Sequence, residues 1–174
     1  MNKIKKSLLG ILLFSLFLLS CNYAPPTKSD SVEKNDSFKK ELIETRLGKS
    51  NLYVSLPKNY KIEENIGSDF EVYYFTPIDT NKVQSLSGGL YLGNHPSEFE
   101  PSNDSCKTDF MTNQVFSKQR KWKIYDCKGE FLLQTIINNK RGEDWNQKIH
   151  IFGNTKSKED LNNLVDIYSS LNHK

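Results

Sequence analysis

From residue 38 to residue 155 the chain is a succession of short β-type runs, and a single helical pattern follows them. The runs are rich in β-branched and aromatic residues and are bounded by Gly, Pro, Asn and Ser, as is typical of strands and turns. In residues 51–56 every second side chain is Leu or Val, which predicts one buried face. The runs cover 41–47, 51–56, 60–64, 70–76, 88–93, 122–126, 130–137 and 145–152, while 109–116 fits a strand or a helix equally well.

The closing pattern predicts one amphipathic helix. Ser157 is a suitable N-cap, and Glu159 and Asp160 lie where the helix dipole favours negative charge. Such a helix should cover one face of an antiparallel sheet, so we expect an α+β fold and a single globular domain in residues 38–174. The apolar side chains at helical spacing are Leu161, Leu164, Val165, Tyr168 and Leu171.

The first residues have the pattern of a targeting segment. Lysines at positions 3, 5 and 6 precede an apolar run, residues 8–19, which is shorter than the ~20 residues that span a bilayer. The run ends in Leu18-Leu19-Ser20-Cys21, which resembles the lipobox of bacterial lipoproteins. The resemblance implies cleavage after residue 20, a diacylglycerol on Cys21 and anchorage in a lipid bilayer. An ordinary cleaved signal and an uncleaved anchor are the alternatives.

The same resemblance suggests a location and a tether. Asn22 stands where enteric lipoproteins retained at the inner membrane carry Asp, so in a Gram-negative cell we expect the outer membrane. Residues 21–37 contain the lipidated cysteine, two prolines and few apolar side chains. Such a composition cannot bury enough surface to fold, so we expect a flexible tether.

The charge balance argues against nucleic acid as a partner. The chain has 24 basic and 21 acidic residues, and three of the lysines lie in residues 1–20. The mature chain therefore has 21 of each and no net charge, whereas nucleic-acid-binding domains carry a basic excess. A local run, Lys118 to Lys123, is read as the solvated edge of a sheet.

Two cysteines remain once Cys21 is lipidated, and they are Cys106 and Cys127. Outside the cytoplasm an even pair predicts one disulfide, worth roughly 3 kcal/mol for a loop of about 20 residues. Two reduced thiols or half of a metal site are the alternatives. Because no CxxC is present and no histidine stands at a ligand spacing from either cysteine, we expect no metal and no cofactor.

The order of predicted elements resembles the PsbP-like fold. The resemblance rests on an N-terminal hairpin ending in Asn51-Leu-Tyr-Val-Ser-Leu-Pro57, a middle of antiparallel strands and a closing helix. That fold occurs in the photosystem II PsbP protein and in small bacterial lipoproteins. Its members differ in function, so the resemblance implies a fold and no reaction.

No established catalytic motif is present in the sequence. The best candidate for a binding site is Gly88 to Pro96, where Tyr91, Asn94 and His95 combine an aromatic face with hydrogen-bonding groups. The alternative is a strand that is bounded by glycines and runs into a turn. His150, between two isoleucines, should point away from them and be partly exposed.

These observations favour a non-enzymatic, lipid-anchored binding or interaction module of the cell envelope. An immunity lipoprotein and an envelope accessory protein are two versions of that role, each with a protein partner. The alternative is a small envelope enzyme that uses His95 with a nearby carboxylate such as Glu98.

Overall fold

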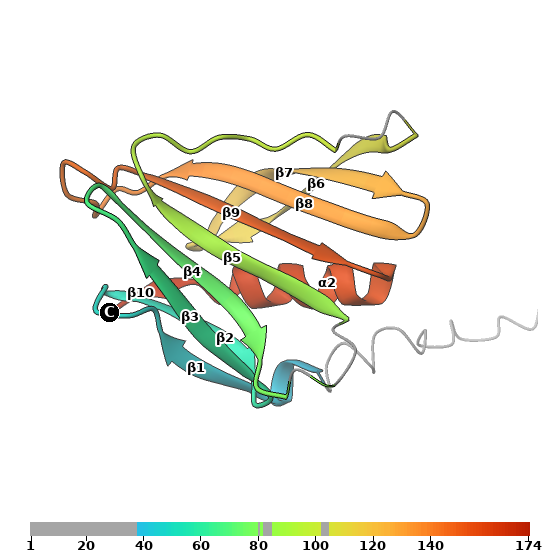
Figure 1. The fold of residues 1–174 in the computed structure, drawn as a ribbon, viewed down its shortest axis with the longest axis horizontal. Helices are drawn as coiled ribbons and strands as arrows, with labels where there is room; N and C mark the ends of the chain where they lie inside the picture. Colours follow the sequence, from blue (N-terminus) through green and yellow to red (C-terminus); the bar gives the residue numbers. More distant parts are fainter. Residues whose placement is uncertain (1–37, 80, 82–84, 102–104) are drawn as a thin grey trace, which may run out of the picture.

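The computed structural model describes residues 38–79, 81, 85–101 and 105–174, which form a short helical turn at 38–40, two antiparallel sheets and a longer helix (Figure 1). The smaller sheet has the order β1-β2-β10. The larger has seven strands in the order β3-β4-β5-β9-β8-β7-β6. The strands of the small sheet are β1 (Leu42–Arg46), β2 (Leu52–Pro57) and β10 (Asn172–His173).

The large sheet is built from two meanders that meet at its centre. The first consists of β3 (Tyr60–Ile66), β4 (Phe70–Pro77) and β5 (Leu86–Gly93). The chain then crosses to the far edge and returns through the second meander until its last strand pairs with β5. That meander consists of β6 (Lys107–Val115), β7 (Lys118–Cys127), β8 (Glu130–Asn138) and β9 (Lys148–Thr155).

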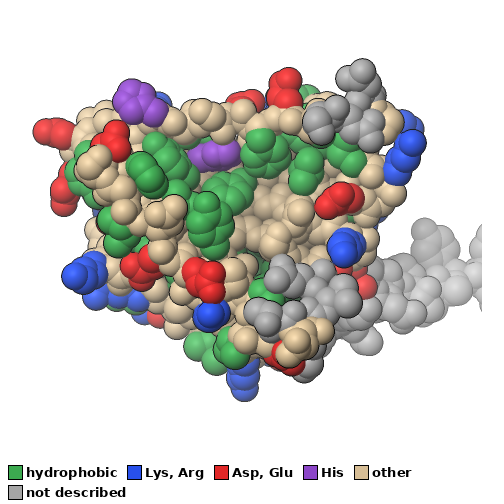
Figure 2. Space-filling view, viewed as in Figure 1, with side chains coloured by type: hydrophobic (Ala, Val, Ile, Leu, Met, Phe, Trp, Pro, Cys, Tyr) green, Lys and Arg blue, Asp and Glu red, His purple; other side chains and the backbone are tan. Residues whose placement is uncertain are grey.

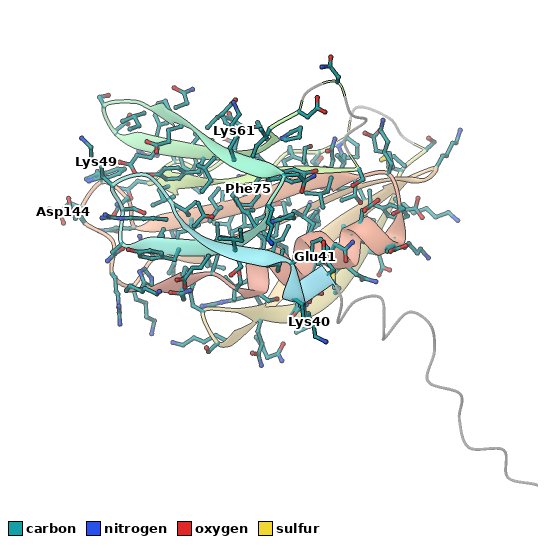
Figure 3. The ribbon with its side chains drawn as sticks, turned by 90° about the horizontal axis from the view of Figure 1, so that it is seen from below. Lys40, Glu41, Lys49, Lys61, Phe75 and Asp144 are labelled. Carbon is teal, nitrogen blue, oxygen red and sulfur yellow. A yellow bond between two sulfur atoms is a disulfide. The ribbon has the colours of Figure 1, made fainter. Side chains whose placement is uncertain are left out.

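The helix α2 (Lys158–Ser169) covers one face of the large sheet. It begins at Ser157, whose hydroxyl accepts a hydrogen bond of 3.0 Å from the Asp160 backbone N–H. Its apolar side contacts β5, β6 and β9 of the large sheet and β2 of the small one. In Figure 3 the view from below places the small sheet in front of the helix.

Aromatic side chains fill the core between α2 and the large sheet. The ring of Tyr168 lies 5.6 Å from that of Trp122 and 5.7 Å from that of Phe75, and all three are buried. The Tyr168 hydroxyl also accepts a hydrogen bond of 3.0 Å from the backbone N–H of Gly89. Gly88 permits this contact, because a Cβ there would lie 2.2 Å from the Tyr168 oxygen.

The α+β class and the helix over one face are confirmed. Of the two alternatives for residues 109–116, the structure has the strand, which covers 107–115. Some bounds differ from the predictions: β9 begins at Lys148 instead of at residue 145, and β7 begins at Lys118 instead of at residue 122. The Lys118 to Lys123 run lies on β7, which has β6 outside it, so it is not the sheet edge.

No helix within the described residues is long and apolar enough to cross a membrane. The predictions for the signal segment, for Cys21 and for the tether all fall on residues 1–37, which lie outside the described residues.

Candidate functional site

The large sheet leaves one face free of the helix, and we call it the open face. At Gly88 and Gly153 an added Cβ would meet Tyr168 and Leu164 of α2, so these positions point to the helix. Side chains alternate along a strand, so their neighbours Ser87, Phe152 and Asn154 point to the open face. Figure 2 looks onto this face and shows apolar side chains gathered over its middle, with charged ones mostly around its rim.

Residues 94–101, which follow β5, cross the open face, and we call them the crossing segment. Its start is fixed by the Asn94 side chain, which donates to the Asp144 carbonyl at 2.6 Å and accepts from the Gln147 backbone N–H at 2.9 Å. Just before β6 the chain is joined to β7 by Cys106 and Cys127, whose sulfur atoms lie 2.05 Å apart, as in a disulfide. Because Lys107 pairs with Asp126, the two cysteines form a cross-strand pair.

Between these two points Gln134 holds the crossing segment to the sheet. Its side-chain amide donates to the Phe99 carbonyl at 2.7 Å, and its Oε1 accepts from the Phe99 backbone N–H at 3.1 Å. The Tyr125 hydroxyl donates to the same carbonyl at 3.2 Å. Gln134 and Tyr125 are both buried, so these bonds are shielded from water and fix Phe99 over β7, β8 and β9.

His150 lies beneath Phe99 and is 5 % exposed, so the expectation of partial exposure was wrong. Its ring centre is 6.0 Å from that of Phe99, a residue far away in sequence that covers it. Burial lowers the pKa of His150, and the Glu98 carboxylate opposes this shift less strongly. Its Nε2 lies 3.0 Å from Gln134 Oε1, an acceptor, so the neutral ring donates from Nε2.

A groove of about 430 Å³ lies beside Phe99 on the open face. Its apolar wall is formed by side chains from β4, β8, β9 and the crossing segment. The rings of Tyr74 and Phe152 meet edge-on, with their centres 6.2 Å apart. The backbone of Gly88 and Gly153, paired across β5 and β9, forms part of its floor. The wall consists of Tyr74, Phe99, Leu132 and Phe152, and the polar rim of Glu63, Thr76, Ser87 and Asn154.

The structure does not bring Tyr91, Asn94 and His95 together in this groove. Tyr91 stacks on Phe70 with the ring centres 6.1 Å apart, and Asn94 is used to fix the crossing segment. His95 is exposed, and among the described residues no hydrogen bond joins it to a carboxylate. Glu98 instead forms an ion pair with Lys123 at 3.4 Å.

The residues of the groove differ from the candidate site residues that the sequence predicts. Side chains alternate between the two faces along β4 and along β9. Once the register of these strands with β5 is known, this alternation puts Tyr74 and Phe152 on the same face of the sheet. Phe99 lies in a segment without periodicity, and its position depends on Gln134, 35 residues away in sequence. No local pattern predicts such a contact.

Comparisons with protein-family models, with curated proteins and with solved structures find no match to this chain. Within the described residues no group of three or more His, Cys, Asp or Glu side chains could hold a metal ion. The groove therefore defines the candidate site by its own chemistry. It offers apolar and aromatic contacts, with hydrogen-bonding groups at the rim.

Proposed function

We propose that the protein is a membrane-anchored lipoprotein of the cell envelope, whose domain is a non-enzymatic binding module. The observation that carries this proposal is the groove on the open face. Its wall is aromatic and aliphatic, and among the described residues that line it Glu63, at the rim, is the only one with a side chain charged at neutral pH. Such a lining suits an apolar group of a ligand or partner better than it suits acid–base chemistry.

The anchor is supported by the first 21 residues. Lipidation of Cys21 would hold the protein at the bilayer, and residues 22–37 would link that cysteine to the domain. The PsbP-like fold is supported by the order of elements, with the hairpin β1–β2, a sheet of antiparallel strands and the helix α2.

A protein partner is the occupant that the groove favours. Tyr74 is 41 % exposed and continues the apolar wall to the surface, so an incoming side chain could bury it. Immunity and envelope-accessory roles both require such a contact.

Site-specific photo-cross-linking in cells tests this proposal. A photoreactive phenylalanine analogue replaces Tyr74 in the groove, and in a control protein it replaces Lys107, which is exposed at the start of β6. We expect a discrete adduct from position 74 that is absent from position 107. Equal labelling at both positions, or none at either, would contradict a binding groove.

The anchor has a separate test. Cys21→Ser should move the protein from the membrane fraction to the soluble fraction, with Cys106→Ser as the control that stays membrane-bound. Continued membrane association of the Cys21 variant would contradict lipid anchorage.

A further inference from the structure

A second hollow, of about 330 Å³, lies at the end of the large sheet where β6 turns into β7. Residues 138–141, at the end of β8 and the start of the β8–β9 connection, and residues 171–173 form the rest of its lining. We call this hollow the basic pocket. Figure 3 shows where the β8–β9 connection lies: its residue Asp144 is well away from Lys40 and Glu41, which stand near the start of the described residues. The described residues that line the pocket include five with basic side chains, Lys118, Arg120, Lys140, Arg141 and His173, and none with an acidic one.

Positive charge is concentrated in this pocket. Elsewhere Lys39, Lys61, Lys123 and Lys174 each form an ion pair with a carboxylate, whereas other exposed lysines such as Lys58 and Lys107 form none in the described residues. Within the described residues, no carboxylate pairs with either lysine or either arginine of the basic pocket. Neighbouring Lys140 lowers the pKa of Lys118, with a smaller effect from Arg120, as expected for uncompensated positive charge.

Arg120 gives the pocket a guanidinium group. Its Nε is shielded from solvent and has no hydrogen-bond partner among the described residues, so the terminal N–H groups are the donors that a ligand in the pocket would meet. The alternation along β7 explains why Lys118 and Arg120 share this pocket while Lys121 and Lys123 lie on the opposite face.

The wall of the pocket is held in place by an aromatic contact. Phe116 stacks on His173, with the ring centres 4.7 Å apart and the planes inclined by 21°. Phe116 and Ser117 form the two-residue β6–β7 turn with φ values of 51° and 57°. Positive φ at both residues is the geometry of a type I′ hairpin turn, which fits the twist of the two strands.

We propose that the basic pocket binds a phosphate group. Two arginines and two lysines can neutralise a dianion, and a guanidinium matches the geometry of phosphate oxygens. The volume leaves room for a small substituent on the phosphate. This site is separate from the groove on the open face, so it does not depend on the function proposed for that groove.

The test is a titration of the lipidated protein in dodecyl maltoside micelles with inorganic phosphate at low ionic strength, followed by NMR. We expect saturable shifts of the Arg120 Nε–H and of the His173 ring protons. Lys118→Gln with Lys140→Gln should weaken binding at least tenfold, whereas Lys58→Gln with Lys107→Gln, at two exposed positions, should leave it unchanged. Sodium chloride should weaken binding.

Two further titrations distinguish the source of the phosphate. Tighter binding of short-chain phosphatidylglycerol than of glycerol 3-phosphate would identify a lipid headgroup, and the reverse order a soluble phosphate ester. The proposal is overturned if phosphate gives no saturable shift, if chloride gives the same shifts at equal ionic strength, or if both double variants bind equally. Because Lys118 and Lys140 are exposed, their replacement should not unfold the protein, and a thermal melt checks this.

Discussion

The side chain of Gln134 makes two hydrogen bonds with the backbone of Phe99, one at each end of its amide. The backbone polarity of Phe99 fixes which end of the amide is oxygen, and that oxygen then faces Nε2 of His150. One buried side chain therefore holds the crossing segment, accepts a hydrogen bond from His150 and positions Phe99 in the wall of the groove.

Gln134→Leu should loosen this arrangement. The change removes both bonds to Phe99 and leaves the buried His150 donor without its acceptor, so we expect a loss of about 2–4 kcal/mol in the free energy of unfolding. Urea denaturation measures it. The control, Gln119→Leu at an exposed position of β7, should change the stability by less than about 0.5 kcal/mol. Equal effects of the two changes would contradict the role given to Gln134.

His150 should make the protein less stable as the pH falls. Its pKa in the native state is below the unfolded value of about 6.5, so below that pH the unfolded chain binds a proton that the native state does not. The free energy of unfolding therefore decreases as the pH falls through this window. His150→Gln should reduce the decrease between pH 7 and pH 5. A titration of the His150 ring by NMR that gave a pKa at or above 6.5 would contradict this account.

The predictable parts of this fold are those with local patterns. The helix follows from its apolar period and Ser157, and the strands from alternation and turn residues. The orientation of His150 away from Ile149 and Ile151 also follows from alternation. Its burial does not, because Phe99 covers it from a segment without periodicity. The basic pocket likewise joins residues from the β6–β7 turn to the C-terminus, which only the topology brings together.

The pair Cys106 and Cys127 should be oxidised in the mature protein. Mass analysis without reductant should give a mass two hydrogens below that of the dithiol form, and alkylation should modify neither residue. Replacement of both by serine should lower the free energy of unfolding by roughly 3 kcal/mol, since the bond closes a loop with a sequence separation of 21. Two alkylated thiols would contradict the disulfide.

Tyr168→Phe should destabilise the core with little change of shape. The hydroxyl is fully buried and partners the Gly89 N–H, so its loss leaves a buried donor unpaired at a cost of about 1–3 kcal/mol. Thermal or urea unfolding measures the change. Tyr74→Phe is the matched control, because Tyr74 is 41 % exposed. An equal effect of the two substitutions would contradict the core role of the Tyr168 hydroxyl.

The most direct test of the binding groove combines a substitution that should prevent binding with the photo-cross-link at position 74. Leu132→Glu puts a charge into the apolar wall, whereas Ile66→Glu puts the same charge on β3 at a residue that is 60 % exposed and outside the groove. The yield of the adduct from the photoreactive residue at position 74 is measured in both backgrounds. We expect the adduct to be lost with Leu132→Glu and retained with Ile66→Glu. An adduct of equal yield in both proteins would contradict a binding groove on the open face.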